Sequence, residues 1–275
     1  EWAPSEKDKI AIIYAVGGII SGASNPGPAG SSIMGDNTII KSIKSAREND
    51  DVKAILLRID SGGGSALASD QMWREILKTT DLSIAKTKED SSNVKPFIAS
   101  MSDVAASGGY YIACQADTII AHPSTITGSI GVIGLRFNLS KLMNKWGISS
   151  DLIKRGEFSD FASGNRLITK EERMKIQESI NSTYEIFKNK VISGRDISSE
   201  LDLDQVAMGR VFTGERAKDK ISIPLVDVNG GIHDAIKLTK SIAGLEDKEV
   251  EIIEYPIPEH KLKEITKTLT KLNKI

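Results

Sequence analysis

Short runs of β-branched residues alternate with helical patterns along this chain, and this alternation constrains the fold more than any other feature. The runs typical of buried strands cover residues 10–16, 52–59, 95–101, 118–121 and 151–153. Helical patterns cover residues 38–48 and 66–78 between them. Strands that alternate with helices predict an α/β fold with a mostly parallel sheet.

A longer helix is predicted from residue 170 to residue 192. Thr169 and Glu172 have the spacing of a capping box at its start, and Gly194 is a plausible stop. Its apolar positions recur every three or four residues and form one face: Ile176, Ile180, Tyr184, Phe187 and Val191. A second amphipathic helix is predicted over residues 261–275, and the polar segment 79–93 is predicted to be an exposed loop.

The composition excludes several classes of function. The 275 residues carry a net charge of −1 and only 5% aromatic residues, which argues against a nucleic-acid partner. A lone cysteine, Cys114, excludes intrachain disulfides, and three dispersed histidines offer no metal site. No cofactor or metal is predicted, and acid–base chemistry would fall to Lys, Asp or Glu.

No targeting or membrane segment is predicted within the chain. Residues 1–9 lack the features of a signal peptide, and the apolar run 10–20 is interrupted by Gly17 and Gly18. We therefore expect a soluble chain, with any membrane attachment through a segment outside it.

Two clusters of small residues follow predicted strands. In the first, Gly62, Gly63 and Gly64 separate a strand from a helix, so backbone N–H groups could approach a ligand closely. A tight turn explains the same pattern equally well. The spacing is not that of a phosphate-binding loop or a dinucleotide fingerprint.

In the second cluster, Ser107 lies among Ala and Gly at the predicted start of helix 108–116. Small neighbours leave room for a substrate carbonyl, and the N–H of Gly108 could stabilise an oxyanion. A plain N-cap is the alternative role for Ser107, and the pattern is not a GxSxG elbow.

The two clusters together resemble the signal peptide peptidase A family. Segments 58–65, 102–111, 127–132, 209–214 and 225–231 match that family in the right order. The resemblance implies a Clp-protease/crotonase-like α/β fold of repeated ββα units. It divides the chain into an N-terminal extension (1–9), a peptidase domain (10–245), and a C-terminal strand and amphipathic helix (246–275).

The resemblance also implies an activity and a place. Members are serine endopeptidases with a Ser–Lys dyad that degrade cleaved signal peptides and other hydrophobic peptides. They are membrane-associated oligomers, which suggests the extracytoplasmic face of a bacterial inner membrane.

Site residues follow from the same resemblance. Ser107 would be the nucleophile, and the N–H of Gly108 with one from Gly63 or Gly64 would form the oxyanion hole. Contacts to substrate are expected from Gly62, Thr127, Gly128 and Ser129. Gly62 replaces a proline that the family usually has, which loosens the turn but keeps the N–H donors.

The general-base lysine is missing from its expected position, which holds Ser159. Three interpretations are open. The lysine could come from an absent N-terminal half, as in tandem members, so that this chain alone would be inactive; identical subunits are the other partner expected. Lys154 could replace it, although an ion pair with Glu157 is the simpler role. The chain could also be a pseudo-peptidase scaffold.

A crotonase-type acyl-CoA enzyme is the alternative from another class. The glycine loop and the helix start could hold a thioester enolate, but the resemblance places no acidic pair there. Cys114 is expected to be a small core residue.

Overall fold

The computed structural model describes residues 7–28, 31–81, 94–161 and 163–256. The helix expected over residues 261–275 and most of the expected loop 79–93 lie outside these ranges.

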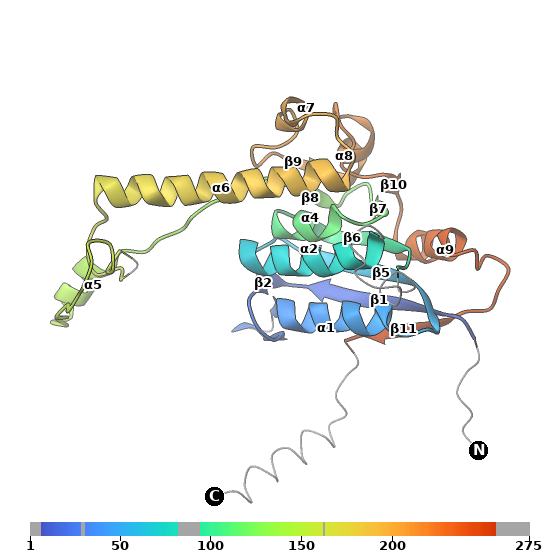
Figure 1. The fold of residues 1–275 in the computed structure, drawn as a ribbon, viewed down its shortest axis with the longest axis horizontal. Helices are drawn as coiled ribbons and strands as arrows, with labels where there is room; N and C mark the ends of the chain where they lie inside the picture. Colours follow the sequence, from blue (N-terminus) through green and yellow to red (C-terminus); the bar gives the residue numbers. More distant parts are fainter. Residues whose placement is uncertain (1–6, 29–30, 82–93, 162, 257–275) are drawn as a thin grey trace, which may run out of the picture.

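One large sheet organises the molecule, with the strand order β10-β7-β6-β5-β1-β11 (Figure 1). All neighbours along this order are parallel. The strands are β1 (Lys9–Val16), β5 (Val52–Ser61), β6 (Phe97–Ala106), β7 (Thr118–Ala121), β10 (Val228–Asn229) and β11 (Glu251–Tyr255). The central strands are apolar almost without interruption because helices cover both of their faces.

Helices cover the two faces unequally. On one face lie α1 (Asp36–Arg47), α2 (Ala66–Thr80) and α4 (Gly108–Ala113), which share the main hydrophobic core with the sheet. On the other face, α9 (Ile232–Ile242) covers a smaller cluster formed by Ile12, Leu56, Ile98 and Ile120. Tyr110, fully buried, anchors α4 by donating its hydroxyl to the carbonyl of Leu225 over 3.1 Å.

Short strands complete the carboxyl edge of the sheet. β8 (Ile126–Gly128) pairs in parallel with the last residues of β6 and antiparallel with β9 (Val211–Thr213). A separate small sheet has the order β2-β4-β3, from β2 (Gly18–Ile20), β4 (Ser32–Gly35) and β3 (Asn25–Pro26). Both additions lie where the large parallel strands end, which is where α/β proteins place their ligands.

The long helix α6 (Lys170–Gly194) begins with the expected capping box between Thr169 and Glu172. The guanidinium of Arg166 bridges the carboxylates of Asp160 and Glu172, and this contact lowers the pKa of Glu172 to about 2. The C-terminal half of α6 packs on α4, where Phe187 stacks on Tyr111 with 4.5 Å between ring centroids.

The other half of α6 projects away from the sheet together with α5 (Ser140–Lys145), as Figure 1 shows. We call residues 133–161 and 163–174 the arm. Two short helices, α7 (Glu200–Asp204) and α8 (Gly214–Asp219), lie near the C-terminal part of α6.

Three details differ from the sequence-based expectations. Residues 151–153 form no strand, and their side chains are exposed because they belong to the arm and meet no partner strand in the described chain. α4 ends at Ala113 rather than at residue 116, and Gly194 is the last residue of α6 rather than its stop. Among the described residues, no helix is long and apolar enough to span a membrane.

Candidate active site

Ser107 occupies the junction between β6 and α4, at the carboxyl end of the sheet. Its backbone has φ 52° and ψ −118°, a region that residues with a side chain rarely adopt. The neighbouring strand holds it there, since the N–H of Ser107 donates to the carbonyl of Gly128 over 3.0 Å. Strain that the surrounding structure enforces is a common property of functional residues.

The hydroxyl of Ser107 does not cap α4. It makes no side-chain hydrogen bond to the helix start, and it has no other hydrogen-bond partner in the described part of the chain. The N-cap alternative for this side chain is therefore wrong, and the hydroxyl is available to a ligand.

Gly63 lies directly against Ser107 and Gly108, which brings the two glycine clusters together. A Cβ on Gly63 would come within 2.6 Å of the Gly108 nitrogen and 2.9 Å of the Ser107 Cβ, so only glycine fits. Its φ of +100° also favours glycine. The first glycine cluster therefore forms a turn and also lets the backbone of the loop lie against the backbone at Ser107 and Gly108.

Hydrogen bonding distinguishes the two candidate donors in this loop. The N–H of Gly63 already donates to the Ser61 hydroxyl over 3.1 Å. The N–H groups of Gly64 and Gly108 have no acceptor among the described residues. Gly64 and Gly108 therefore carry the amides that a ligand beside Ser107 could accept from.

A cavity of about 310 Å³ opens beside Ser107. Small residues from the glycine loop and α2 form one side, and apolar side chains form the other. Its lining comprises Gly64, Ser65, Ala66, Ser69, Ser107, Gly108, Tyr111, Gly131, Val132, Ile133, Thr183 and Phe187. Every lining residue is uncharged, which suits an apolar ligand.

Four residues expected to contact substrate do not line this cavity. The Thr127 hydroxyl is buried and donates to the Ala105 carbonyl over 2.8 Å, inside the sheet. Gly128 holds the backbone of Ser107, and the N–H of Ser129 donates to the carbonyl of Arg210. Gly62 is exposed at the tip of the loop. A role in substrate binding stays a prediction for all four.

The described chain places no lysine in the cavity lining. Lys188 lies among the carboxylates of Glu185, Glu200 and Asp204, and these raise its pKa. The ammonium of Lys190 lies 3.3 Å from the ring centroid of Trp73. The carboxylates around Lys188 stabilise its charged form, which is the opposite of what a general base requires.

Neither Lys154 nor Ser159, which occupies the position where the family has its lysine, lines the cavity beside Ser107. Lys154 pairs with Asp160 over 3.0 Å, on the arm, so it has the simple ion-pair role with a different acidic partner from the one expected. Ser159 is exposed and donates to the carbonyl of Gly156.

One lysine does have a strongly lowered pKa. Burial lowers the pKa of Lys95 to about 8, and its ammonium donates to the carbonyls of Ala46 and Asn49. Lys95 precedes β6, whereas Ser107 follows it, so a ten-residue strand of about 30 Å separates them.

Sequence reasoning missed most of the cavity wall. Ser69 repeats Ser65 one helical turn later, a spacing that could have indicated a shared face. Phe187 was expected on the apolar face of its helix, but no local pattern indicates that this face meets Tyr111. Val132 ends the matched segment 127–132 and Ile133 follows it, and no motif marks either as part of a cavity wall.

The arrangement suits acyl transfer. It offers a free hydroxyl, two unpaired amides beside it and an apolar cavity, which correspond to a nucleophile, oxyanion donors and a side-chain pocket. No cluster of metal-ligating side chains occurs among the described residues. Cys114 is buried and its pKa is raised to about 12, so this thiol is no second nucleophile.

Comparison with known proteins agrees with this geometry. The model of peptidase family S49 matches residues 89–246. The chain is 41% identical to the chloroplastic serine protease SPPA of Arabidopsis thaliana over 94% of its own length and 36% of that protein. It is 36% identical to Protease 4 of Salmonella typhi, over 86% of this chain and 35% of that protein.

A protein of Synechocystis sp. that bears a protease name is 35% identical over 92% of this chain and 82% of its own length. Among solved structures, a ClpP1 mutant from Listeria monocytogenes has a TM-score of 0.47 and 13% identity, over 82% of this chain and 94% of that one. The chain spans only about a third of the plant and Salmonella relatives. It belongs to peptidase family S49, the signal peptide peptidase A family, and its large parallel sheet has the α/β architecture expected from the sequence.

Proposed function

We propose that this chain is the nucleophile-bearing part of a serine endopeptidase, with Ser107 as the nucleophile. The observation that carries the proposal is the unpartnered Ser107 hydroxyl, held at a positive φ beside the free amides of Gly64 and Gly108. The serine protease name of the Arabidopsis relative supports the same reaction class.

In the proposed acylation, Ser107 Oγ bonds to the carbonyl carbon of the scissile peptide while its proton passes to a base. The carbonyl oxygen becomes an oxyanion that accepts from the N–H groups of Gly108 and Gly64, with the loop position held by Gly63. The C–N bond then breaks, and the base returns its proton to the leaving amine. Water hydrolyses the resulting ester by the same steps in reverse.

The base is a lysine from outside this chain, either from an N-terminal half or from an identical subunit. The absence of lysine from the cavity lining of the described chain supports this source. A lysine enclosed by a partner would lose hydration, which lowers its pKa and makes the neutral amine available. We expect the isolated chain to be inactive for this reason.

The arm supports the need for a partner. Its apolar side chains are far more exposed than a single subunit tolerates well: Ile133, Leu135, Phe137, Trp146, Leu152, Ile153 and Leu167. An exposed apolar surface of this kind marks a protein–protein interface. A partner seated on the arm would also be close to the cavity, because Ile133 belongs to both.

Hydrophobic peptides, including cleaved signal peptides, are the proposed substrates. The uncharged lining of the cavity supports an apolar side chain next to the scissile bond. A location on the extracytoplasmic face of a bacterial inner membrane stays a prediction, since the Arabidopsis relative is named as chloroplastic.

The proposal is tested on the full-length protein, or on this chain with an added N-terminal half, using a fluorogenic apolar peptide. Ser107→Ala should lower kcat/KM by roughly 10⁴-fold or more, because the other serine hydroxyls of the cavity, those of Ser65 and Ser69, are held in hydrogen bonds at the start of α2. Ser241→Ala serves as the matched control, since this serine is exposed on α9, outside both the cavity lining and the arm.

Unchanged cleavage by the Ser107→Ala protein would show that another residue is the nucleophile. Inactivity of the wild-type assembly, with every partner present, would instead favour the pseudo-peptidase scaffold. Formation of a tetrahedral adduct between Ser107 Oγ and the boron of a peptidyl boronic acid separates these two outcomes, since a scaffold does not react.

A further inference from the structure

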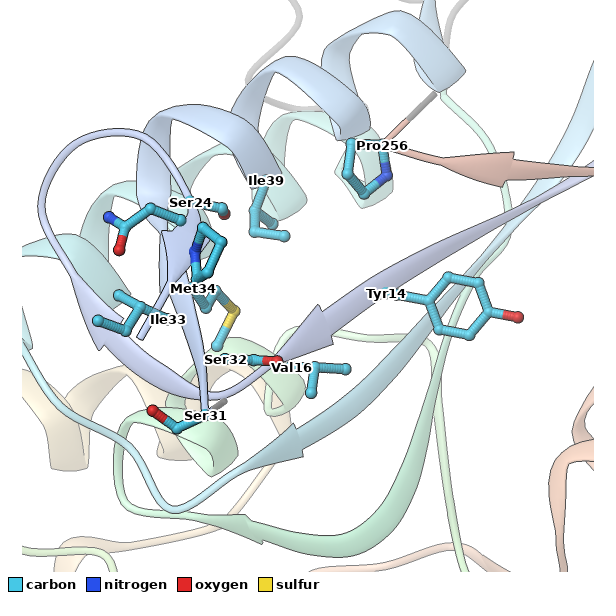
Figure 2. A pocket seen from close by; sticks show the side chains of 11 residues that line it. Tyr14, Val16, Ser24, Ser31, Ser32, Ile33, Met34, Ile39 and Pro256 are labelled. Atoms are coloured by element: carbon cyan, nitrogen blue, oxygen red, sulfur yellow. The ribbon is translucent and has the colours of Figure 1, made fainter. Parts of the chain in front are cut away.

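A second cavity, of about 430 Å³, lies at the far side of β1 and shares no lining residue with the cavity beside Ser107. Figure 2 shows it between β1, α1 and the small sheet. Its main apolar contributors are Val16, Pro26, Ile33, Met34, Ile39 and Pro256. We call it the β1 groove.

The groove lies at a short gap in the edge of the large sheet. β1 pairs with β5 as far as Val16, but its pairing with β11 ends at Ile13, opposite Tyr255, and β4 pairs with β2 only from Gly18 on. The residue after β11 is Pro256, which has no N–H to donate to the β1 carbonyl beside it. Within the described chain, Tyr14 to Val16 therefore have a strand partner on one side only.

The walls of the groove match the geometry of an added strand. Side chains of a strand point alternately to the two faces of its sheet. On one face, α1 and β4 provide Ile39 and Met34, both nearly fully buried. On the other face, Tyr14 and Val16 are partly exposed, and Figure 2 shows Val16 beside Ser32 at the groove.

The chemistry of the lining indicates the kind of ligand. None of the lining residues is charged, and three serines and one asparagine supply the polar groups at its rim. An apolar pocket alone would suit many ligands, but an open strand edge presents N–H and C=O groups at the spacing of a polypeptide backbone.

We propose that the β1 groove binds an extended, uncharged apolar peptide segment, which pairs with Tyr14–Val16 as an additional strand. The peptide backbone pairs with the edge of β1, and alternate side chains enter the two walls. This site is separate from the cavity beside Ser107, and its occupancy does not depend on catalysis by Ser107.

The test uses a capped seven-residue peptide of Val, Leu and Ala that carries a photoactivatable leucine, with the Ser107→Ala protein to prevent turnover. Crosslinked sites are mapped by mass spectrometry. We expect crosslinks to Tyr14–Val16 and to Ile33 and Met34. Val16→Asp should reduce these crosslinks about tenfold, because an unpaired carboxylate would be desolvated by the peptide.

Ile252→Asp is the matched control. Ile252 lies on β11, is 43% exposed against 38% for Val16, and is outside the groove. Ile252→Asp should leave the crosslink yield within about twofold of that of the parent protein. The tenfold loss expected for Val16→Asp corresponds to about 1.4 kcal/mol of binding free energy.

Crosslinks confined to residues 131–133 and 183–187 would mean that the peptide binds only beside Ser107, and would overturn the proposal. Crosslinks in the groove that Val16→Asp leaves unchanged would do the same. A second copy of the chain could occupy the groove instead of a peptide. In that case Val16→Asp would dissociate a dimer in sedimentation velocity without peptide, and this result would also contradict the proposal.

Discussion

At the scale of single residues, the candidate site depends on backbone geometry more than on side chains. Ser107 contributes a hydroxyl, whereas Gly64 and Gly108 contribute only amides. Gly63 contributes a surface without a Cβ, against which Ser107 and Gly108 can pack. Substitutions that move the backbone of these glycines should therefore impair acylation of Ser107 as strongly as removing the amides would.

Gly64→Ala is expected to impair acylation of Ser107 by roughly 10²- to 10³-fold. Gly64 has φ +154°, and a Cβ there would lie 2.2 Å from the Ile19 carbonyl oxygen, so the loop must move and take its amide with it. The measurement is the rate at which an activated peptide ester acylates Ser107 in the partnered protein, followed by release of the alcohol.

Gly62→Ala is the control for that substitution. A Cβ at Gly62 meets nothing within 4 Å, so the loop keeps its position and the acylation rate should stay within about twofold. An equal loss of rate from the two substitutions would contradict the assignment of Gly64 as a donor.

The sequence allowed these loop residues to be predicted because they are local in the chain. Ser107, Gly63, Gly64 and Gly108 each lie within a motif of a few residues. The walls of the cavity could not be predicted, since Phe187 reaches it from a helix about 80 residues further along. Tertiary packing decides which apolar faces of distant elements contact each other, and no short sequence pattern predicts these contacts.

At the scale of secondary-structure elements, β6 joins two chemically different ends of the sheet. Its first end follows Lys95, whose buried ammonium bonds the carbonyls at the end of α1, and its last residue precedes Ser107. The strand itself was predicted because its β-branched and apolar residues form a continuous run. Residues 151–153 have a similar composition but no neighbouring strand, so composition alone gave a wrong prediction there.

Lys95 should make stability depend on pH above neutrality. Its pKa is about 8 when folded and 10.5 when free, so between these values the unfolded chain binds more protons, and rising pH favours the folded state. The free energy of unfolding of the wild type, relative to Lys95→Met, should increase by roughly 1 to 3 kcal/mol from pH 7.5 to 10.5.

Guanidinium denaturation of both proteins at pH 7.5, 9 and 10.5 measures this difference. Other lysines and tyrosines titrate in both proteins, so their contributions cancel in the comparison. A difference that is flat or falls with pH would show that burial does not lower the pKa of Lys95.

At the scale of the whole molecule, the chain divides into a body with a buried core and an arm with an exposed apolar surface. The body has a core on both faces of the sheet. In the arm, Ile133 is 94% exposed and Ile153 is 100% exposed. Apolar side chains that stay in water do not stabilise a monomer. The α/β class could be predicted from sequence, but the division into body and arm could not, because the apolar residues of the arm resemble those of a core.

Trp146→Asp combined with Ile153→Asp should prevent assembly with the partner and abolish peptide cleavage by the full-length protein. Both side chains are exposed, so the melting temperature of this chain alone should change by no more than about 2 °C. Sedimentation velocity and cleavage of an apolar peptide measure the two effects.

Leu201→Asp is the control, because Leu201 is 80% exposed on α7, outside the arm. It should leave assembly and cleavage unchanged. If the double variant of the arm assembles normally, the partner does not bind there.

One continuous helix connects the arm to the cavity. α6 has 25 residues and is about 37 Å long; it begins in the arm and carries Thr183 and Phe187 into the cavity wall. A helix of this length is a stiff rod rather than a hinge. A neighbour bound at its outer end would therefore shift the inner end as well, and the width of the cavity beside Ser107 would change with it.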